Sequence, residues 1–251
     1  MKKRTLFVLI SISFLLLSAQ NVMAQRIGLK AFHKDTEEFG FARDYIESLH
    51  YLKVASELMQ RADPKNVNYD NEVDMITTFM KNLRLANRDL RMSKGILNKY
   101  KNSNNELMKM TADLVSLSYD KQIKINNEGL KLYEGLFNSR SGDSDEEFDH
   151  GSFLREISKL AADKEVVLQS LLKCSMMLTH ILVSKVPDKE GNINFLTVSS
   201  EEREKLIRII DKIFGDSVKG GMRPGQNYLD ACAAVVRQVL ADPGWKTSDD
   251  R

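Results

Sequence analysis

The stretch that decides the fold is LQSLLKCSMMLTHILV, residues 168–183, because apolar side chains occupy nearly every side of the helix that it predicts. A helix of this kind is typical of the middle of a bundle. It is too short to span a bilayer, which needs about 20 apolar residues, and Lys173 and His180 interrupt it. We therefore expect the innermost helix of an all-α protein, with His180 as a core histidine.

The N-terminus has the pattern of a signal peptide. A basic start at residues 2–4 precedes the apolar run 6–17, and the sequence VMA at 22–24 fits a cleavage site before Gln25. The apolar run is shorter than the roughly 20 residues that a membrane anchor needs. No cysteine lies near the site to accept a lipid. We expect residues 1–24 to be removed, and the remaining chain to be soluble, without a transmembrane segment, and periplasmic or secreted.

The charge balance is even. The sequence has 37 Lys and Arg residues and 35 Asp and Glu residues. The three basic residues at 2–4 leave with the signal peptide, so the rest of the chain carries 34 against 35, a net charge of −1. Such a mixture gives no polyelectrolyte attraction, so we expect no nucleic-acid partner. The low content of proline and glycine favours long helices.

Apolar periodicity and capping residues divide residues 25–251 into about six helices, expected to form a single helical domain. Their expected ranges are about 36–62, 70–101, 106–137, 153–184, 199–214 and 227–240. The polar turn at 102–105 joins two of them into a long antiparallel, coiled-coil-like hairpin. Ser199 and Glu202 have the spacing of a capping box. Residues 138–152, rich in Ser, Gly and acidic side chains, are expected to be a flexible boundary.

Two further expectations concern side-chain environments. In the helix over 106–137 the inward row is expected to be Leu107, Met110, Leu114, Leu117, Ile125, Leu132 and Leu136. The polar middle of that helix, residues 120–129, is expected to be more exposed or bent. Trp245, which follows the last helix, is expected in a polar tail.

Four residues are the candidates for a metal site. Glu47 with His50, and Glu147 with His150, repeat the Glu-x-x-His spacing found in di-iron four-helix bundles. The second pair lies among glycine and aspartate residues of the boundary segment rather than in a firm helix. Such a pattern also arises by chance in a chain with many glutamates, so the preferred interpretation is solvated or capping residues without a cofactor.

No sequence motif indicates catalysis. The chain has no Gly-x-Ser-x-Gly elbow, no His-Glu-x-x-His helix, no phosphate loop and no Cys-x-x-Cys-His site. Cys174 and Cys232 each fall on the apolar face of an expected helix. In an exported protein they can form a disulfide that closes a loop of about 60 residues, worth roughly 4 kcal/mol. Two buried free thiols are the equal alternative.

Together these patterns predict an exported, soluble helical-bundle protein of the bacterial envelope that is not an enzyme. Long amphipathic helices present extended faces to a partner or enclose a cleft. The expected role is therefore the binding of a protein or a small molecule. The alternative is an exported helical metal-binding protein or hydrolase that uses Glu47 and His50.

Overall fold

The computed structural model describes residues 35–61, 72–141, 148–184, 191 and 195–251. The expected signal peptide lies outside these residues, and so do Glu147 and most of the connection between 185 and 194. Residues 37–251 pack together as one unit. Its helices follow from the periodicity of the sequence and from side chains that cap their ends.

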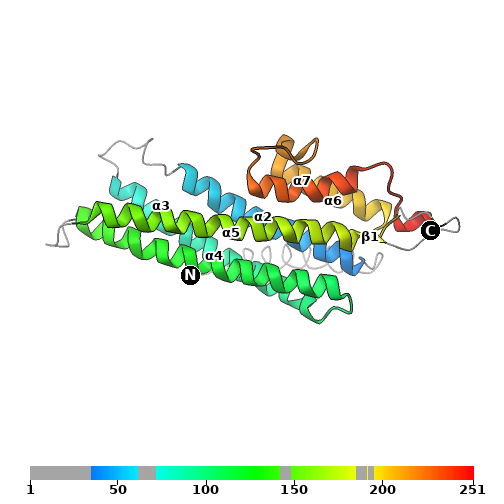
Figure 1. Cartoon of the computed structure of the whole chain (residues 1–251), viewed down its shortest axis with the longest axis horizontal. Coiled ribbons are helices and arrows are strands. Elements are labelled where there is room, and N and C mark those ends of the chain that lie inside the picture. The colour runs from blue at the N-terminus through cyan, green and yellow to red at the C-terminus, as the bar shows by residue number, and fades with distance from the viewer. Residues whose placement is uncertain (1–34, 62–71, 142–147, 185–190, 192–194) are drawn as a thin grey trace, which may run out of the picture. The chain divides into compact units, whose positions relative to one another are not determined.

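Four long helices form the main bundle: α2 (Glu37–Arg61), α3 (Glu72–Asn98), α4 (Glu106–Ser141) and α5 (His150–Leu182). Two shorter helices, α6 (Ser200–Phe214) and α7 (Tyr228–Ala241), pack on α2, and α7 also packs on α5 (Figure 1). The described residues also include three short 3-10 helices: η3 (Lys99–Asn102), η4 (Gly215–Val218) and η5 (Ser248–Asp250). The predicted all-α bundle of about six helices is confirmed.

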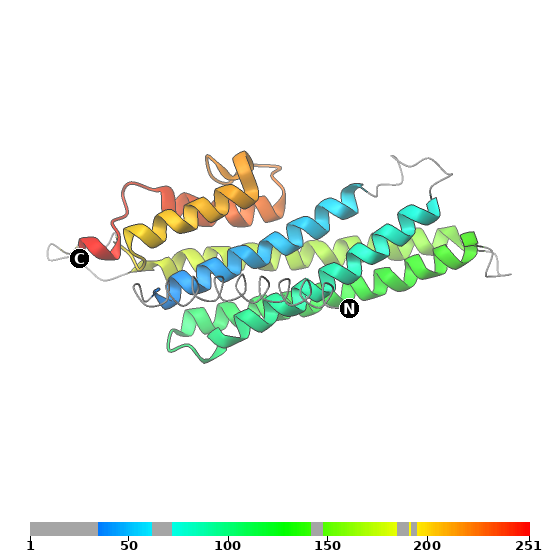
Figure 2. The same ribbon diagram turned by 180° about the vertical axis from the view of Figure 1, so that it is seen from behind.

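Consecutive long helices pack against each other, α2 on α3, α3 on α4 and α4 on α5 (Figures 1 and 2). Ion pairs show the direction of the α3–α4 hairpin. Lys94 Nζ lies 2.5 Å from Asp120 Oδ2, and Lys101 Nζ lies 3.4 Å from Asp113 Oδ1. The lysine further along α3 and η3 pairs with the aspartate that comes earlier in α4, so the two helices are antiparallel, as predicted.

Side chains cap the helices where the sequence indicated turns. Asn105 Oδ1 accepts hydrogen bonds from the backbone N–H groups of Leu107 and Met108 at 3.1 Å each, which starts α4. Ser199 and Glu202 form the predicted capping box of α6. The expected boundary segment 138–152 contributes its first four residues to α4 and its last three to α5.

Helix α5 is central, but one stripe of it faces solvent. Gln169, Lys173, Met176 and His180 follow the spacing of one helix face, and all four are exposed. The prediction of a core histidine at His180 is therefore wrong, because the polar residues of α5 share this stripe. Among the described helices, only α5 is long and apolar enough, by length and composition, to cross a membrane. The core helix of a soluble protein meets the same criterion.

The buried face of α4 differs from the predicted row. Met110 and Leu117 are 58% and 66% exposed, so their predicted inward position is wrong. The buried positions in this half are Met108, Thr111, Ala112, Val115, Ser116, Ser118 and Tyr119. Because this buried face contains small polar residues, the sequence pattern wrongly indicated that it faces solvent. The polar middle is divided: Asp120, Lys124, Asn127 and Glu128 are exposed, as expected. Gln122 and Asn126 are only 3% and 4% exposed, so the expectation is wrong for these two residues.

The C-terminal residues return to the bundle. Strands β1 (Val183–Ser184) and β2 (Phe195–Leu196) pair antiparallel, and Lys246 forms a parallel bridge with Phe195. Trp245 is half-buried against the main core, so its predicted place in a polar tail is wrong. Arg203 fixes this arrangement, because its guanidinium donates hydrogen bonds to the carbonyls of Leu240, Asp242 and Trp245.

The apolar core has two parts. The larger cluster takes residues from each of the described α-helices, α2 to α7. The smaller cluster belongs to α3 and α4, with Phe153 of α5 and Phe148 packed against it, and its buried members are Ile76, Phe79, Met80, Leu83, Leu130 and Leu136. The candidate site lies where the two clusters meet.

Candidate binding cavity

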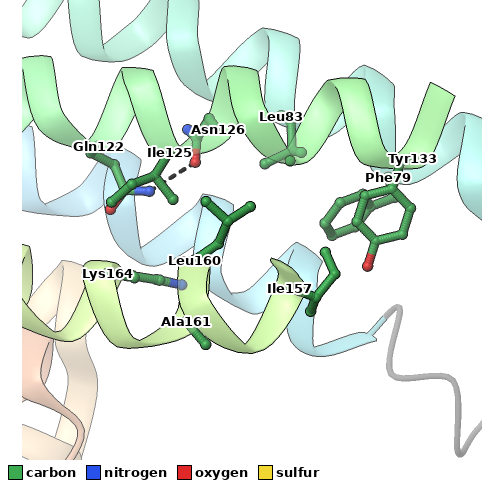
Figure 3. Close-up of a pocket in the computed structure, with 11 residues that line it drawn as sticks. Phe79, Leu83, Gln122, Ile125, Asn126, Tyr133, Ile157, Leu160, Ala161 and Lys164 are labelled. Carbon is green, nitrogen blue, oxygen red and sulfur yellow. Dashed lines mark hydrogen bonds between the residues drawn. The ribbon is translucent and has the colours of Figure 1, made fainter. Parts of the chain in front are cut away.

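A cavity of about 220 Å³ lies between α3, α4 and α5 (Figure 3). Its described lining residues are Phe79, Leu83, Gln122, Ile125, Asn126, Gly129, Tyr133, Ile157, Leu160, Ala161 and Lys164. Lys164 Nζ donates a hydrogen bond to Ser56 Oγ of α2 at 3.3 Å. Only residues 57–61 of α2 lie beyond that level, whereas α3, α4 and α5 continue. In the described part of the chain, the cavity therefore forms where four long helices give way to three.

One end of the cavity is aromatic. The rings of Phe79 and Tyr133 lie with their centroids 4.2 Å apart, and the ring of Phe153 meets Tyr133 edge-on at 5.5 Å. Burial raises the pKa of the Tyr133 phenol, so this group stays neutral. These rings present apolar surface to a ligand.

Gly129 keeps the middle of the cavity open. It is buried in α4, and a Cβ atom there would lie 3.8 Å from a methyl carbon of Leu83 and 3.8 Å from one of Leu160. These are ordinary contact distances, so a side chain would fit without a clash. The absent side chain is thus part of the volume of the cavity.

A chain of amide groups closes the other end. Gln122 Nε2 donates to Asn126 Oδ1 at 2.8 Å, Asn126 Nδ2 donates to Asn87 Oδ1 at 2.9 Å, and Asn87 Nδ2 donates to Asn127 Oδ1 at 2.8 Å. These bonds join α3 to α4 and satisfy polar groups that burial would otherwise destabilise. They also fix the orientation of the Gln122 side chain.

The side-chain carbonyl oxygen of Gln122 takes no part in this series of amide hydrogen bonds. Within the described residues, Gln122 Oε1 is one of three buried side-chain atoms without a hydrogen-bond partner, with His50 Nδ1 and Ser93 Oγ. Figure 3 shows this oxygen turned away from Asn126 and toward α5. A buried acceptor without a donor costs about 1–3 kcal/mol. The oxygen is enclosed by protein atoms, so it is not part of the surface that the cavity offers to a ligand.

Lys164 lies at the same end as Gln122. The neighbouring residues Lys121 and Asp163 form an ion pair at 3.7 Å, which sets Gln122 and Lys164 at one level of the antiparallel helices. Burial lowers the pKa of Lys164. Figure 3 shows Gln122 and Lys164 at one end of the cavity, with Phe79 and Tyr133 at the other. The cavity therefore suits an amphiphilic molecule.

The four predicted metal candidates do not line this cavity. Glu47 is exposed on α2, His50 is half-buried one turn later, and His150 is exposed at the start of α5. Tyr45 Oη donates to the Leu171 carbonyl at 2.6 Å, and Lys164 Nζ donates to Ser56 Oγ at 3.3 Å. Between these two contacts of the antiparallel helices, His50 lies level with about residue 168 of α5. His150 is therefore about 27 Å away along the helix.

Glu147 lies outside the described residues. Among the residues that are described, no group of three or more His, Cys, Asp or Glu side chains could hold a metal ion.

The two cysteines lie in the main core and not in the cavity. Cys174 of α5 and Cys232 of α7 are buried free thiols. Burial raises the pKa of each thiol to about 12. Such thiols react poorly at neutral pH, because the thiolate is the nucleophile. A disulfide between them, which the sequence left as one of two equal alternatives, stays a prediction.

A second hollow, of about 380 Å³, is lined by α2, η4, the start of α7 and Phe214 of α6. Two of its charged side chains already pair with each other, since Lys53 Nζ lies 3.2 Å from Asp230 Oδ1. The same ammonium lies 4.8 Å from the centre of the Phe214 ring. Asn227 accepts a hydrogen bond from the Leu229 backbone as the cap of α7. This hollow is therefore less suited to a ligand.

The sequence reasoning missed Gln122, Asn126, Gly129 and Lys164. A signal was present at Asn87, which lies between Leu83 and Leu90 on the inward face of α3. A polar residue at such a position needs a buried partner, and Asn126 provides it. Comparisons with protein-family models, curated proteins and solved structures found no match, so the argument about function depends on the cavity.

Proposed function

We propose that this chain is exported to the periplasm or the medium, where it binds an elongated, mainly apolar molecule in the cavity between α3, α4 and α5 without changing it chemically. The observation that carries the proposal is a mostly apolar, partly enclosed cavity with a few polar side chains, Gln122, Asn126 and Lys164, in its lining. Sites for small molecules combine apolar walls with a few polar groups in this way. Burial of the ligand's apolar surface supplies the affinity.

The dimensions of the cavity limit the ligand. A cavity of about 150 Å³ holds benzene, with its six heavy atoms, so one of about 220 Å³ suits about nine. The lining residues of α4 run from Gln122 to Tyr133, which corresponds to about 16 Å of helix axis. An extended alkyl chain matches this combination of length and volume better than a fused ring system.

Calorimetric titration of the purified protein with 1-nonanol and with methyl octyl ether tests the proposal. These isomers have ten heavy atoms each, and both should bind. Gly129→Met fills the cavity with a flexible side chain and should weaken both at least tenfold. Gly95→Met is the matched control, because Gly95 is exposed on α3 and no described atom lies within 4 Å of its Cβ position. Absence of binding for both compounds would refute the proposal.

Export is tested separately by N-terminal sequencing of the protein from the exported fraction. The expected first residue is Gln25. A membrane-bound form that retains residues 1–24 would contradict the proposed localisation, whatever the cavity binds.

A protein-interaction role is the second candidate, because apolar side chains lie on the outer face of α3. Leu85, Met92 and Ile96 share one helix face and are 38%, 61% and 43% exposed. Light scattering over a range of concentrations tests whether this face joins two copies of the chain. A mass that rises for the natural protein and stays monomeric for Met92→Lys would favour this role.

A further inference from the structure

The polar side chains in the lining of the cavity are already engaged with the protein. Asn126 accepts a hydrogen bond from Gln122 through Oδ1 and donates one to Asn87 through Nδ2. The Oε1 atom of Gln122 is enclosed by protein atoms, and Lys164 Nζ donates to Ser56 Oγ. A polar ligand group inside the cavity would lose its hydrogen bonds to water without replacing them in full, which is unfavourable. The interior therefore favours a hydrocarbon segment.

In the described part of the chain, the cavity reaches solvent along one edge of α5. Ile157, Ala161 and Lys164 follow the spacing of a single helix edge, and all three line the cavity. Ala161 is exposed and the other two are half-buried, whereas Leu160, which lines the cavity from the inner side of α5, is buried. A polar group attached to a buried hydrocarbon segment can remain in water at this edge.

We propose that the cavity holds the alkyl tail of a single-chain amphiphile whose head group stays in solvent at the edge formed by Ile157 and Ala161. This inference rests on the proposed function, because it names the class of molecule that the same cavity holds. The affinity then depends on the length of the tail and not on the chemistry of the head. Each buried methylene group adds affinity until the cavity is full, which its volume sets at about nine carbon atoms.

Calorimetry on the purified protein compares 1-nonanol, nonyl maltoside and nonylphosphocholine, each below its micelle concentration. These compounds share the same tail and differ in the head, which is a hydroxyl, an uncharged disaccharide or a zwitterion. Their dissociation constants should agree within about threefold, because a head that stays in water changes the binding free energy little. In a series of alkyl maltosides, affinity should rise about fourfold per methylene group from hexyl to nonyl and level off from nonyl to dodecyl.

Three variants test the placement of the head. Tyr133→Phe removes a hydroxyl from the aromatic end but keeps the ring that packs against Phe79, so it should leave all three dissociation constants unchanged. Ala161→Trp places a large ring at the exposed edge and should weaken the binding of nonyl maltoside roughly tenfold. Ala162→Trp is the matched control, because Ala162 is also exposed on α5 but does not line the cavity.

The outcomes separate the two proposals. Binding of 1-nonanol without binding of the two amphiphiles that have larger heads would overturn the inference and leave the cavity as a site for whole small molecules. A difference of more than about threefold between the maltoside and the phosphocholine, or weaker binding by Tyr133→Phe, would overturn it in favour of a recognised head. Equal effects of Ala161→Trp and Ala162→Trp would contradict the placement of the head. No binding of any of the three compounds would refute the proposed function itself.

Discussion

Replacement of Gly129 by alanine measures the open space in the centre of the cavity. Gly129 lies inside α4, is buried, and has room for a Cβ atom at 3.8 Å from Leu83 and Leu160. We therefore expect the substitution to increase stability.

The gain has two parts. Alanine is better than glycine inside a helix by about 1 kcal/mol, and burial of one additional methyl group adds up to about 0.8 kcal/mol. Gly129→Ala should therefore raise the free energy of unfolding by about 1.5–2 kcal/mol. Gly95→Ala, on the exposed face of α3, should gain only the first part, about 1 kcal/mol.

Urea denaturation followed by far-ultraviolet circular dichroism measures both variants. The difference between them isolates the contact with Leu83 and Leu160 from helix propensity. If Gly129→Ala is no more stable than Gly95→Ala, or is less stable than the natural protein, the space beside Gly129 is absent and the argument for a ligand in the cavity fails.

Three other perturbations test the core and the C-terminal contacts. Because the folded pKa of Cys174 and Cys232 is raised from 9.0 to about 12, the unfolded chain ionises first as pH rises, and stability should fall by about 3 kcal/mol between pH 7 and pH 10. A disulfide would remove the thiol contribution until a reductant is added and would leave a smaller fall from buried tyrosines such as Tyr133, whose pKa is also raised. Urea curves with and without reductant therefore distinguish the two states, and a pH-independent stability of the reduced protein would contradict the burial of the thiols. Arg203→Met should lower the free energy of unfolding by about 2 kcal/mol, because it removes the donors to three backbone carbonyls. Arg208→Met is the control and should change it little. Equal effects of the two substitutions would contradict the bridging role of Arg203. Asp44→Asn should lower the free energy of unfolding, measured by urea denaturation, by about 2 kcal/mol. The buried carboxylate accepts hydrogen bonds from the side chains of Arg43 and Tyr100 and pairs with Lys99. An unchanged denaturation midpoint would refute that estimate.

The positions of the helices were predictable from the sequence, whereas their buried faces were only partly so. The capping box at Ser199 and the polar turn before Asn105 depend on neighbours within a few residues, so local sequence predicts them well. The inward face of α4 depends on which helix lies opposite, and Leu117 was therefore assigned wrongly. A leucine faces solvent there because the buried face already holds Val115, Ser118 and Tyr119.

The candidate site could not be derived from sequence patterns. Its parts are single residues separated by about 40 positions along the chain, such as Asn87 and Asn126, and no short motif joins them. Gly129 in a helical pattern looks like a weak helix position until Leu83 and Leu160 are seen on either side of the missing side chain. The candidate metal residues share a spacing, but helix packing places His50 and His150 far apart.

Local patterns were enough to predict an all-α chain with long helices, because periodicity, caps and glycine or proline act within a turn or two. Helix packing places α3, α4 and α5 beyond the described end of α2, brings Gln122 and Lys164 to one end of the resulting cavity, and returns Trp245 to the core. A cavity is produced by the ends and side chains of several helices together, so none of these helices predicts it alone.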